Sequence, residues 1–422
     1  MRGVSVWAGL LGFSDAVVED VELDPGRGVI IARVRVRRRV ALRCSRCLAT
    51  SARYDRGQGR RRWRHLDAGV LKVFIVAEAP RVACRGCGVT VAHVPWAHAD
   101  TGHTHDFDRQ VAWAATRMSK TAVTTLIRIA WRTVGAILER YWRDVQDCFD
   151  QYTGLRRIGI DEIAYKKGHK YLTIVVDHDT GRLVWAGPGR DTATLQEFFT
   201  LLGPDRAARI TLVSADAAWY ITAAVTRHLP NATICTDPFH VIAWATRALD
   251  YERRQARNRA PGRAHNVALT HHNSTGTARD LKNARWALWK NPENLTEKQQ
   301  ATLDWIATTD PPLHQAYLLK EGLRYVFKLK GPDGIAALDE WLTWVKTTAL
   351  PVFHRVARSI EKNRDTINAA LTHRLSNALI ESMNTKIRQI TRTAYGFHHP
   401  DNLIALALLT HGGYRPTLPR RN

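Results

Sequence analysis

The segment from residue 156 to residue 250 changes between two hydrophobic periods in an order that few folds can accommodate. Apolar runs with strand character occupy 156–164, 170–177 and 182–185, with a turn sequence at 178–181. Helical and strand patterns then alternate, as a helix over 192–202, a strand over 210–214, a helix over 217–229, a strand over 233–235 and a helix from Pro238. The predicted order is therefore β-β-β-α-β-α-β-α.

This order predicts an α/β domain with one mixed sheet. Three antiparallel strands followed by right-handed crossover units make a five-stranded sheet with helices on both faces, and the fourth strand then neighbours the first. The order is that of ribonuclease H-like folds. Since a fold does not define a function, the chemistry has to come from the side chains on these strands.

Three carboxylates are placed to meet at one edge of this sheet. Asp161 lies inside the first apolar strand, where a charge is costly unless something pairs with it. Asp216 directly follows the fourth strand, at the carboxyl end where ligands collect, and Glu381 lies on a helix predicted over 375–390. Three such acids can hold two divalent ions about 4 Å apart at a phosphodiester, so the pattern predicts metal-dependent nuclease or transesterase chemistry.

Other polar residues near these acids have simpler interpretations. Glu162 should point to the face opposite Asp161, and Asp177 begins a hairpin turn, so we expect both to be bystanders. Asp237 precedes a helix and is interpreted as its cap and as a neighbour of the site. His240 either contacts the scissile phosphate or a metal ion, or is structural.

Four of the six cysteines form two Cys-x-x-Cys pairs, Cys44 with Cys47 and Cys84 with Cys87. Two such pairs can close a four-thiolate structural zinc site with no open position for chemistry. Strands predicted over 33–43 and 70–77 would bring the pairs together. Free thiols or a redox pair are the alternatives, and we expect Cys148 and Cys235 to be core thiols.

The charge balance points to a polyanionic partner. Lys and Arg number 62 against 39 Asp and Glu, a formal net charge of +23, and nucleic acid is the leading candidate. No run of about 18 apolar residues occurs, so we expect a soluble, intracellular protein with no membrane partner. Two basic runs could lie on phosphates or form a solvated face; their candidate DNA-binding residues are Arg35, Arg37, Arg60, Arg61, Arg62 and Arg64.

Helical spacing over 106–143 predicts three short helices, with Ser119 capping the second. The third, over 131–141, has the basic residues that a recognition helix needs. The segment is interpreted as a helix-turn-helix, with a plain three-helix linker as the alternative. Its candidate DNA-binding residues are Arg128, Arg132 and Arg140.

These features occur together in longer motifs, GIDEIAYKKGHKYLTIVVD around Asp161, VSADAAWY around Asp216, DPFHVI from Asp237 and SNALIESMNTKIRQITRTAYGF around Glu381. With the cysteine pairs and the helix-turn-helix, they make the chain resemble the DDE transposases of bacterial insertion sequences, specifically the ISL3 family. One departure is visible after Asp216, where the sequence reads Ala217-Ala218 in place of a methionine or similar residue before the aromatic.

The resemblance implies a DNA transposase that binds the terminal inverted repeats of its element and catalyses strand cleavage and strand transfer. It implies Asp161, Asp216 and Glu381 as the catalytic triad, with two Mg²⁺ or Mn²⁺ ions beside the one structural zinc. Double-stranded DNA would be the partner, a homodimer would form on it, and the protein would be cytoplasmic and associated with the bacterial nucleoid. Residues that could support the site are Asp237, His240, Asn384, Lys386, Arg388 and Arg392.

The expected domains are a zinc module over 1–100, a helix-turn-helix over 101–150, a catalytic core over 151–250 and 366–422, and between them a helical insertion over 251–365. A densely basic stretch runs from Asp250 to His265. Five tryptophans of the insertion either pack in its core or stack on an unpaired base; they are Trp286, Trp289, Trp305, Trp341 and Trp344. The alternative functions are a catalytically inactive DNA-binding regulator and a related metal-dependent nuclease or resolvase.

Overall fold

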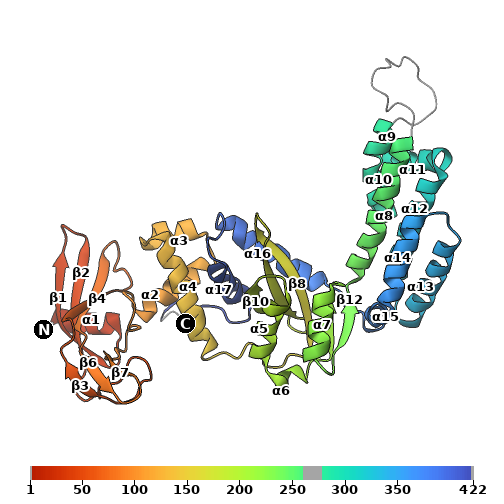
Figure 1. Cartoon of the computed structure of the whole chain (residues 1–422). Coiled ribbons are helices and arrows are strands. Elements are labelled where there is room, and N and C mark those ends of the chain that lie inside the picture. Colours follow the sequence, from red (N-terminus) through yellow and green to blue (C-terminus); the bar gives the residue numbers. More distant parts are fainter. Residues whose placement is uncertain (1, 260–277, 420–422) are drawn as a thin grey trace. The chain divides into compact units, whose positions relative to one another are not determined.

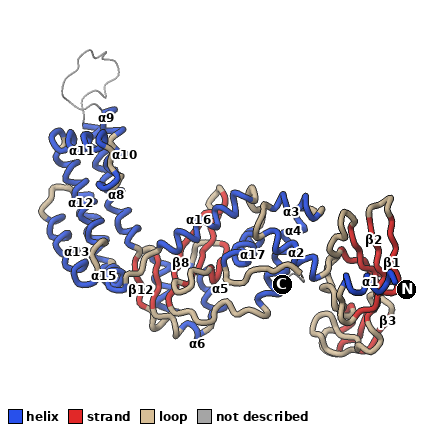
Figure 2. The backbone as a smooth tube through the Cα atoms, turned by 180° about the vertical axis from the view of Figure 1, so that it is seen from behind, coloured by secondary structure: helices blue, strands red, loops and turns tan. Residues whose placement is uncertain are grey.

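The computed structural model describes residues 2–259 and 278–419 (Figure 1). The chain divides into two compact units. The first unit comprises Met1–Asp150 and Ile390–Asn422, and the second comprises Gln151–Gln389. Strands occur in the amino-terminal part of the first unit and in the central sheet of the second, and the rest is mainly helical (Figure 2).

The amino-terminal part of the first unit contains two small sheets and the helix α1 (Arg2–Leu11). Trp63 and Trp96 pack edge to face in its core and are almost fully buried. One sheet has the order β1-β2-β5-β4, with bounds Ala16–Asp24, Val29–Val36, Lys72–Glu78 and Arg60–Arg64. The other has the order β3-β6-β7, with bounds Ala52–Asp55, Arg81–Cys84 and Gly88–Val91.

The alternating basic run forms a strand for only part of its predicted length. Ala32 and Val34 of β2 are buried while Arg33 and Arg35 are half-buried, as the alternation predicts. The strand ends at Val36, however, and the prediction of a strand through residue 43 was wrong. A turn follows, closed by the hydrogen bond from the Val40 N–H to the Arg37 carbonyl, because three consecutive exposed arginines give that stretch no buried face.

The three predicted helices are present as α2 (His105–Ala115), α3 (Lys120–Ile127) and α4 (Trp131–Gln146). Ser119 caps α3 as expected, accepting a hydrogen bond from the Ala122 N–H. Helices α3 and α4 meet at a bend of 102°, inside the usual helix-turn-helix range. By length and composition alone, α3 and α4 together could form a bent membrane span. Among the described residues, no single helix is long and apolar enough to cross a bilayer.

The second unit contains the five-stranded sheet that the sequence predicts. Strands β8 and β9, and β9 and β10, pair antiparallel, whereas β11 runs parallel to both β8 and β12. The mixed α/β prediction and its ribonuclease H-like strand order are therefore confirmed. The sheet order is β10-β9-β8-β11-β12, with bounds Leu183–Pro188, Lys170–Asp177, Arg157–Lys166, Leu212–Ala215 and Thr233–Thr236.

Helices cover both faces of this sheet. On one face Ile158 and Ile160 of β8 belong to the same apolar cluster as Phe198 of α5 (Thr192–Leu202) and Val225 of α7 (Trp219–His228). A short helix α6 (Pro204–Ala207), which the sequence analysis did not predict, follows α5. On the other face Gly159 meets α16 (Ala378–Thr393), which begins three residues later than predicted.

The described residues between the sheet and α16 form helices joined by short loops, and no strand occurs among them. Helix α8 (Pro238–Arg259) begins just after β12 and packs with the later helices of this segment in a bundle (Figure 1). The basic stretch from Asp250 belongs to α8 as far as Arg259, and its remainder lies outside the described residues. The later elements are α9 (Ala278–Asn283), α10 (Arg285–Trp289), α11 (Glu297–Thr309), α12 (Pro311–Val326), α13 (Gly331–Lys346), α14 (Pro351–Lys362) and α15 (Arg364–His373).

The stretch over 291–300 contains two separate elements. A 3₁₀ turn spans Pro292–Asn294, and α11 starts afresh after Thr296, which forms a capping box with Gln299. Of the tryptophans, Trp341 is buried and donates a hydrogen bond to the Leu319 carbonyl, and Trp305 and Trp344 pack partly buried against the bundle core. Trp286 and Trp289 are exposed, so base stacking remains a hypothesis for these two alone.

Candidate functional site

Asp161 lies on β8, and Asp216 directly follows β11, the strand that runs parallel to β8. The β8 and β11 register pairs Gly159 with Ser214, two residues before each aspartate, so Asp161 and Asp216 lie at the same edge of the sheet. Burial raises the pKa of Asp161, and the nearby Asp216 carboxylate raises it further. The sequence prediction that these two carboxylates converge agrees with this geometry.

Helix α16 approaches Asp161 across the face of β8 on which Gly159 has no side chain. A Cβ on Gly159 would lie 2.1 Å from Cδ1 of Ile380, so only glycine permits this approach. Asn384 of α16, almost fully buried, donates from Nδ2 to Oδ2 of Asp161 over 2.7 Å. The other carboxylate oxygen accepts the Glu162 N–H over 2.7 Å, and these two donors fix the orientation of Asp161.

Glu381 lies one helical turn before Asn384, in the first turn of α16. It is exposed, and its pKa is raised by partial burial and by the Asp237 carboxylate, while His240 and Arg388 act in the opposite direction. The carboxylate oxygens of the three acids Asp161, Asp216 and Glu381 do not all lie within 4.8 Å of one another. Three acids that share two ions need not form such a group, because each ion takes its own subset of ligands.

Asp237 connects the end of β12 to the start of α16. Its Oδ1 accepts the Asn377 N–H over 3.2 Å, and the Asn377 carbonyl in turn accepts the Glu381 N–H over 2.8 Å. The Asp237 carbonyl accepts the His240 and Val241 N–H groups at the start of α8, and the role of Asp237 as a side-chain cap of this helix stays a prediction. Asp237 is therefore a neighbour of the site that positions the helix carrying Glu381.

His240 lies between two of the carboxylates. Its Nε2 is 3.5 Å from Oδ2 of Asp216, and its Nδ1 is 3.9 Å from Oδ2 of Asp237. A hydrogen bond with Asp237 raises the pKa of His240, burial opposes this, and Asp216 and Asp161 add to the increase. The imidazole therefore holds a proton more readily than usual beside the acids.

Buried oxygen atoms without a donor make this cluster suited to a cation. Oδ1 of Asp216 and Oδ1 of Asn384 are buried, and neither has a hydrogen-bond partner among the described residues. Hard divalent ions such as Mg²⁺ prefer carboxylate and amide oxygens. The donor set of Asp161, Asp216 and Asn384 fits such an ion, and Glu381 lies one helical turn before Asn384 on α16.

Sequence reasoning missed two features of the site, the proximity of Glu162 to Asp216 and the role of Gly159. Glu162 was expected to be remote, but burial and the Asp216 carboxylate raise its pKa to about 7, and Arg190 opposes this increase. Strand alternation assigns its face correctly but does not limit the reach of a long side chain at a sheet edge. Gly159 could have been found, because an isolated glycine in a strand signals close approach of another element. Asp177 accepts hydrogen bonds from Asp179 and Thr180, as expected of a turn residue.

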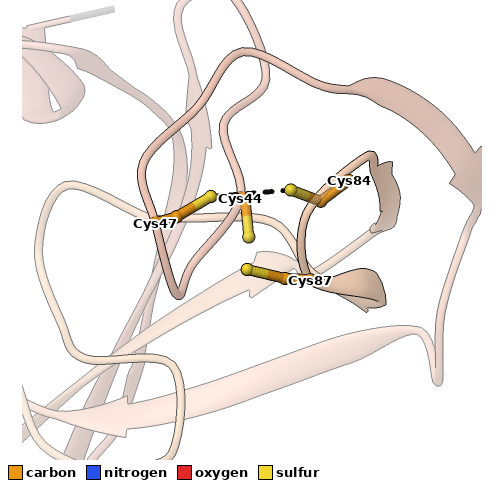
Figure 3. A group of neighbouring side chains, drawn as sticks. All are labelled: Cys44, Cys47, Cys84 and Cys87. Atoms are coloured by element: carbon orange, nitrogen blue, oxygen red, sulfur yellow. Dashed lines mark hydrogen bonds between the residues drawn. The ribbon is translucent and has the colours of Figure 1, made fainter.

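The four paired cysteines converge on one point (Figure 3). Their sulfur atoms all lie within 4.8 Å of one another, and Sγ of Cys47 is 3.5 Å from Sγ of Cys84. The backbone N–H groups of Cys87 and Gly86 lower the pKa of Cys84 to about 6, whereas competition with Cys47 raises the pKa of Cys87. A tetrahedral zinc fits this set. Cys235 is buried as predicted, but Cys148 is exposed, because it lies just beyond the end of α4.

Several arginines predicted to bind DNA make contacts inside the first unit. Arg64 is buried and forms an ion pair with Asp67, which also pairs with Arg128. Arg140 forms a largely buried ion pair with Asp108 at 2.8 Å. Other internal contacts are those of Arg35 with Glu19, Arg61 with the carbonyls of Ala99 and Thr101, and Arg62 with the Phe74 ring.

The remaining basic candidates are exposed. Arg37, Arg60 and Arg132 lie on the surface of the first unit, as does Arg392. Lys386 and Arg388 are exposed on α16 within the second unit. Exposed cations of this kind are free to move onto phosphates. Arg140 cannot do so without rearrangement, because it is held in a buried ion pair.

Comparison with known families identifies the same set of domains. A model of the DDE enzymes of ISL3 elements, described as "Transposase", matches residues 158–407. A "Helix-turn-helix domain of transposase family ISL3" matches residues 92–142, and a "zinc-finger of transposase IS204/IS1001/IS1096/IS1165" matches residues 41–87. A ribonuclease H-like sheet combined with these two DNA-binding modules is the arrangement of a transposase.

Full-length relatives lead to the same result. The transposase for insertion sequence element IS1557 of Mycobacterium tuberculosis is 55% identical, over 100% of this chain and 98% of its own length. The transposase for IS1001 of Bordetella parapertussis is 27% identical over 92% of this chain and 93% of its own length. The chain belongs to the ISL3 family of DDE transposases, which confirms the resemblance found in its motifs.

Proposed function

We propose that this transposase binds the terminal inverted repeats of its own element and cuts and rejoins DNA strands at a site built from Asp161, Asp216 and Glu381. The observation that carries the proposal is the proximity of Asp161 on β8 to Asp216 just beyond the neighbouring strand β11, with a buried Asp216 oxygen that has no hydrogen-bond donor among the described residues. Two like charges held together in this way are costly without a cation.

Two Mg²⁺ or Mn²⁺ ions would be held by Asp161, Asp216 and Glu381, and when bound they stabilise the attacking and leaving oxygens of a phosphodiester. Asn384 and the Glu162 N–H orient Asp161 toward this task. Each carboxylate oxygen has two lone pairs, so an oxygen that accepts one hydrogen bond can still bind an ion. Asp237 keeps the start of α16, and so Glu381, in place.

His240 has a separate role in this proposal. Held between Asp216 and Asp237, with a raised pKa, it can donate a hydrogen bond to a phosphate oxygen at the scissile position. Lys386 and Arg388, exposed on α16, would contact phosphates on either side of that position. In the first unit the exposed Arg37, Arg60, Arg62 and Arg132 would contact the element ends.

The domain assignment follows from these roles. Residues 1–100 and 101–150 would recognise the ends, residues 151–250 and 366–422 would perform catalysis, and residues 251–365 form the helical insertion. Joining two ends of an element in one complex needs two binding surfaces, so we propose a homodimer on DNA.

The test uses the purified protein with Mg²⁺ and a labelled DNA that carries the ends of the element encoding it. End-specific nicks and strand-transfer products are expected from the wild type and not from Glu381→Gln. Glu162→Gln is the matched control, because it removes an acid on β8 that is not proposed as a ligand. Specific binding without products in either Mg²⁺ or Mn²⁺ would instead favour the regulator, and cleavage of branched DNA without end preference would favour a resolvase.

A further inference from the structure

A second cluster of metal-binding side chains lies in the first unit, distinct from the four cysteines. It consists of His98 in the segment between β7 and α2, His105 at the first position of α2, and Asp144 near the end of α4. Their ligand atoms all lie within 4.8 Å of one another, although His98 and Asp144 are 46 positions apart in the chain. None of the three takes part in the proposed catalysis.

The distances within this cluster are close to those between the ligand atoms of a tetrahedral zinc ion. Nε2 of His98 is 2.9 Å from Oδ2 of Asp144, and the rings of His98 and His105 are 4.5 Å apart between centroids. A zinc ion with bonds of about 2.0–2.1 Å holds its ligand atoms about 3.3 Å apart. Small side-chain rotations therefore suffice to place an ion among the three groups.

The electrostatic surroundings also suit a cation. Asp144 places a carboxylate beside the imidazoles, within hydrogen-bond distance of His98. Arg140, a cation that acts on His98, already pairs with Asp108 at 2.8 Å. His93 interacts electrostatically with both His98 and His105, so a third imidazole lies in the same neighbourhood.

Backbone hydrogen bonds hold the ligand-bearing segment in shape. The His105 N–H donates to the Trp96 carbonyl over 2.9 Å, which closes the segment into a loop. Thr101 donates to the His98 carbonyl from both its N–H and its hydroxyl. Arg61 donates to the carbonyls of Ala99 and Thr101. These hydrogen bonds fix the shape of the loop that carries His98.

We propose that His98, His105 and Asp144 bind a second structural metal ion, zinc, in this transposase. Two imidazoles and one carboxylate are a usual zinc ligand set, with water or a further imidazole at the fourth position. The ion would fasten the loop after β7 to both α2 and α4, and so brace the helix-turn-helix against the segment that precedes it. This inference does not depend on the catalytic proposal.

Zinc content of the full chain tests the proposal. After reconstitution with zinc and dialysis against zinc-free buffer, we expect two ions per wild-type chain and one per His105→Gln chain. His103→Gln is the matched control and should keep two, because His103 stacks on Phe107 and is not part of the cluster. Equal zinc content in the wild type and His105→Gln, whether one ion or two, would overturn the proposal.

A second measurement needs no variant and so is unaffected if His105→Gln fails to fold. Zinc X-ray absorption of the wild-type chain reports the average ligand shell. With both sites filled, we expect nitrogen and oxygen ligands at about 2.0–2.1 Å beside sulfur ligands at about 2.3 Å. A shell made of sulfur alone would show that only the cysteine site binds zinc, and would contradict the proposal.

Discussion

The two units handle clustered charge in opposite ways. In the first unit Arg64, Arg128 and Arg140 are matched by Asp67 and Asp108 in ion pairs that help to hold the fold together. In the second unit Asp161 and Asp216 are brought together with like charge, and burial and repulsion raise the pKa of Asp161. The four cysteines of the first unit resemble the acids in this respect, because their thiolates also converge.

This difference separates structural charge from functional charge better than sequence position does. In the sequence, every arginine of a basic run is a candidate for DNA binding. In the folded protein, some of these arginines form internal ion pairs. A cluster of like charges with buried, unsatisfied oxygen or sulfur atoms has no such structural explanation, and a bound cation would relieve it.

Removal of zinc should have the largest effect. Structural zinc sites contribute on the order of 10 kcal/mol to folding, so a chelated protein should lose the folded region around Cys44 and Cys84 and bind element ends poorly. Thermal unfolding and a gel-shift assay, before and after zinc is restored, measure this. Unaltered folding and binding in a verified zinc-free protein would remove the cysteine site from the comparison.

Asp161→Asn should reduce strand cleavage about a thousandfold, equivalent to about 4 kcal/mol of transition-state stabilisation, because a neutral amide is a poor ligand for a divalent ion. End binding should be nearly unchanged. Cleavage rates and binding affinity on the same labelled end provide the measurement, with Glu162→Gln expected to keep a rate within about tenfold of the wild type. Retained cleavage in Asp161→Asn would refute the proposed site.

Arg140→Ala should destabilise the protein by about 3 kcal/mol, because it leaves the Asp108 carboxylate buried without its partner. The effect should appear in denaturant unfolding more than in the affinity of the folded protein for DNA. Adding Asp108→Asn should recover most of the lost stability. A large loss of affinity with normal stability would return Arg140 to the DNA-contacting set.

Gly159→Ala should lower both stability and cleavage, with an overpacking cost of about 1–3 kcal/mol, because the new methyl group collides with Ile380 and displaces α16. The double variant Gly159→Ala with Ile380→Ala should regain part of the cleavage rate. If the single variant cleaves as fast as the wild type, the close approach of α16 is not what positions Asn384 and Glu381.

Arg132→Ala should have the smallest effect. An exposed phosphate contact contributes about 1 kcal/mol, and its loss should reduce the slope of log affinity against log salt by about 1. Stability should not change, since the side chain is exposed. Titrations at several salt concentrations test this, and an unchanged slope would remove Arg132 from the proposed DNA surface.

Much of the fold could be predicted because the sheet is built from strong local signals. Apolar runs, the turn before Gly181 and the alternation of helix and strand gave the element order, and the handedness rule gave the neighbours of β8. Errors arose where a local pattern had no partner to sustain it, as in the strand expected beyond Val36 and in the core position expected for Cys148. In neither case does sequence periodicity show that the stretch lacks packing partners in the folded protein.

The groups that this protein has for chemistry can be identified from its amino-acid sequence. The two Cys-x-x-Cys pairs, the aspartates at β8 and β11 and the glutamate of α16 can be found from spacing and strand ends, since local periodicity places them. Only the tertiary structure decided which charges are paired. Arg140 meets Asp108, Asn384 meets Asp161 and His98 meets Asp144 across long stretches of chain. Such pairings depend on how helices pack on one another and on the sheet, and no short-range pattern encodes that packing.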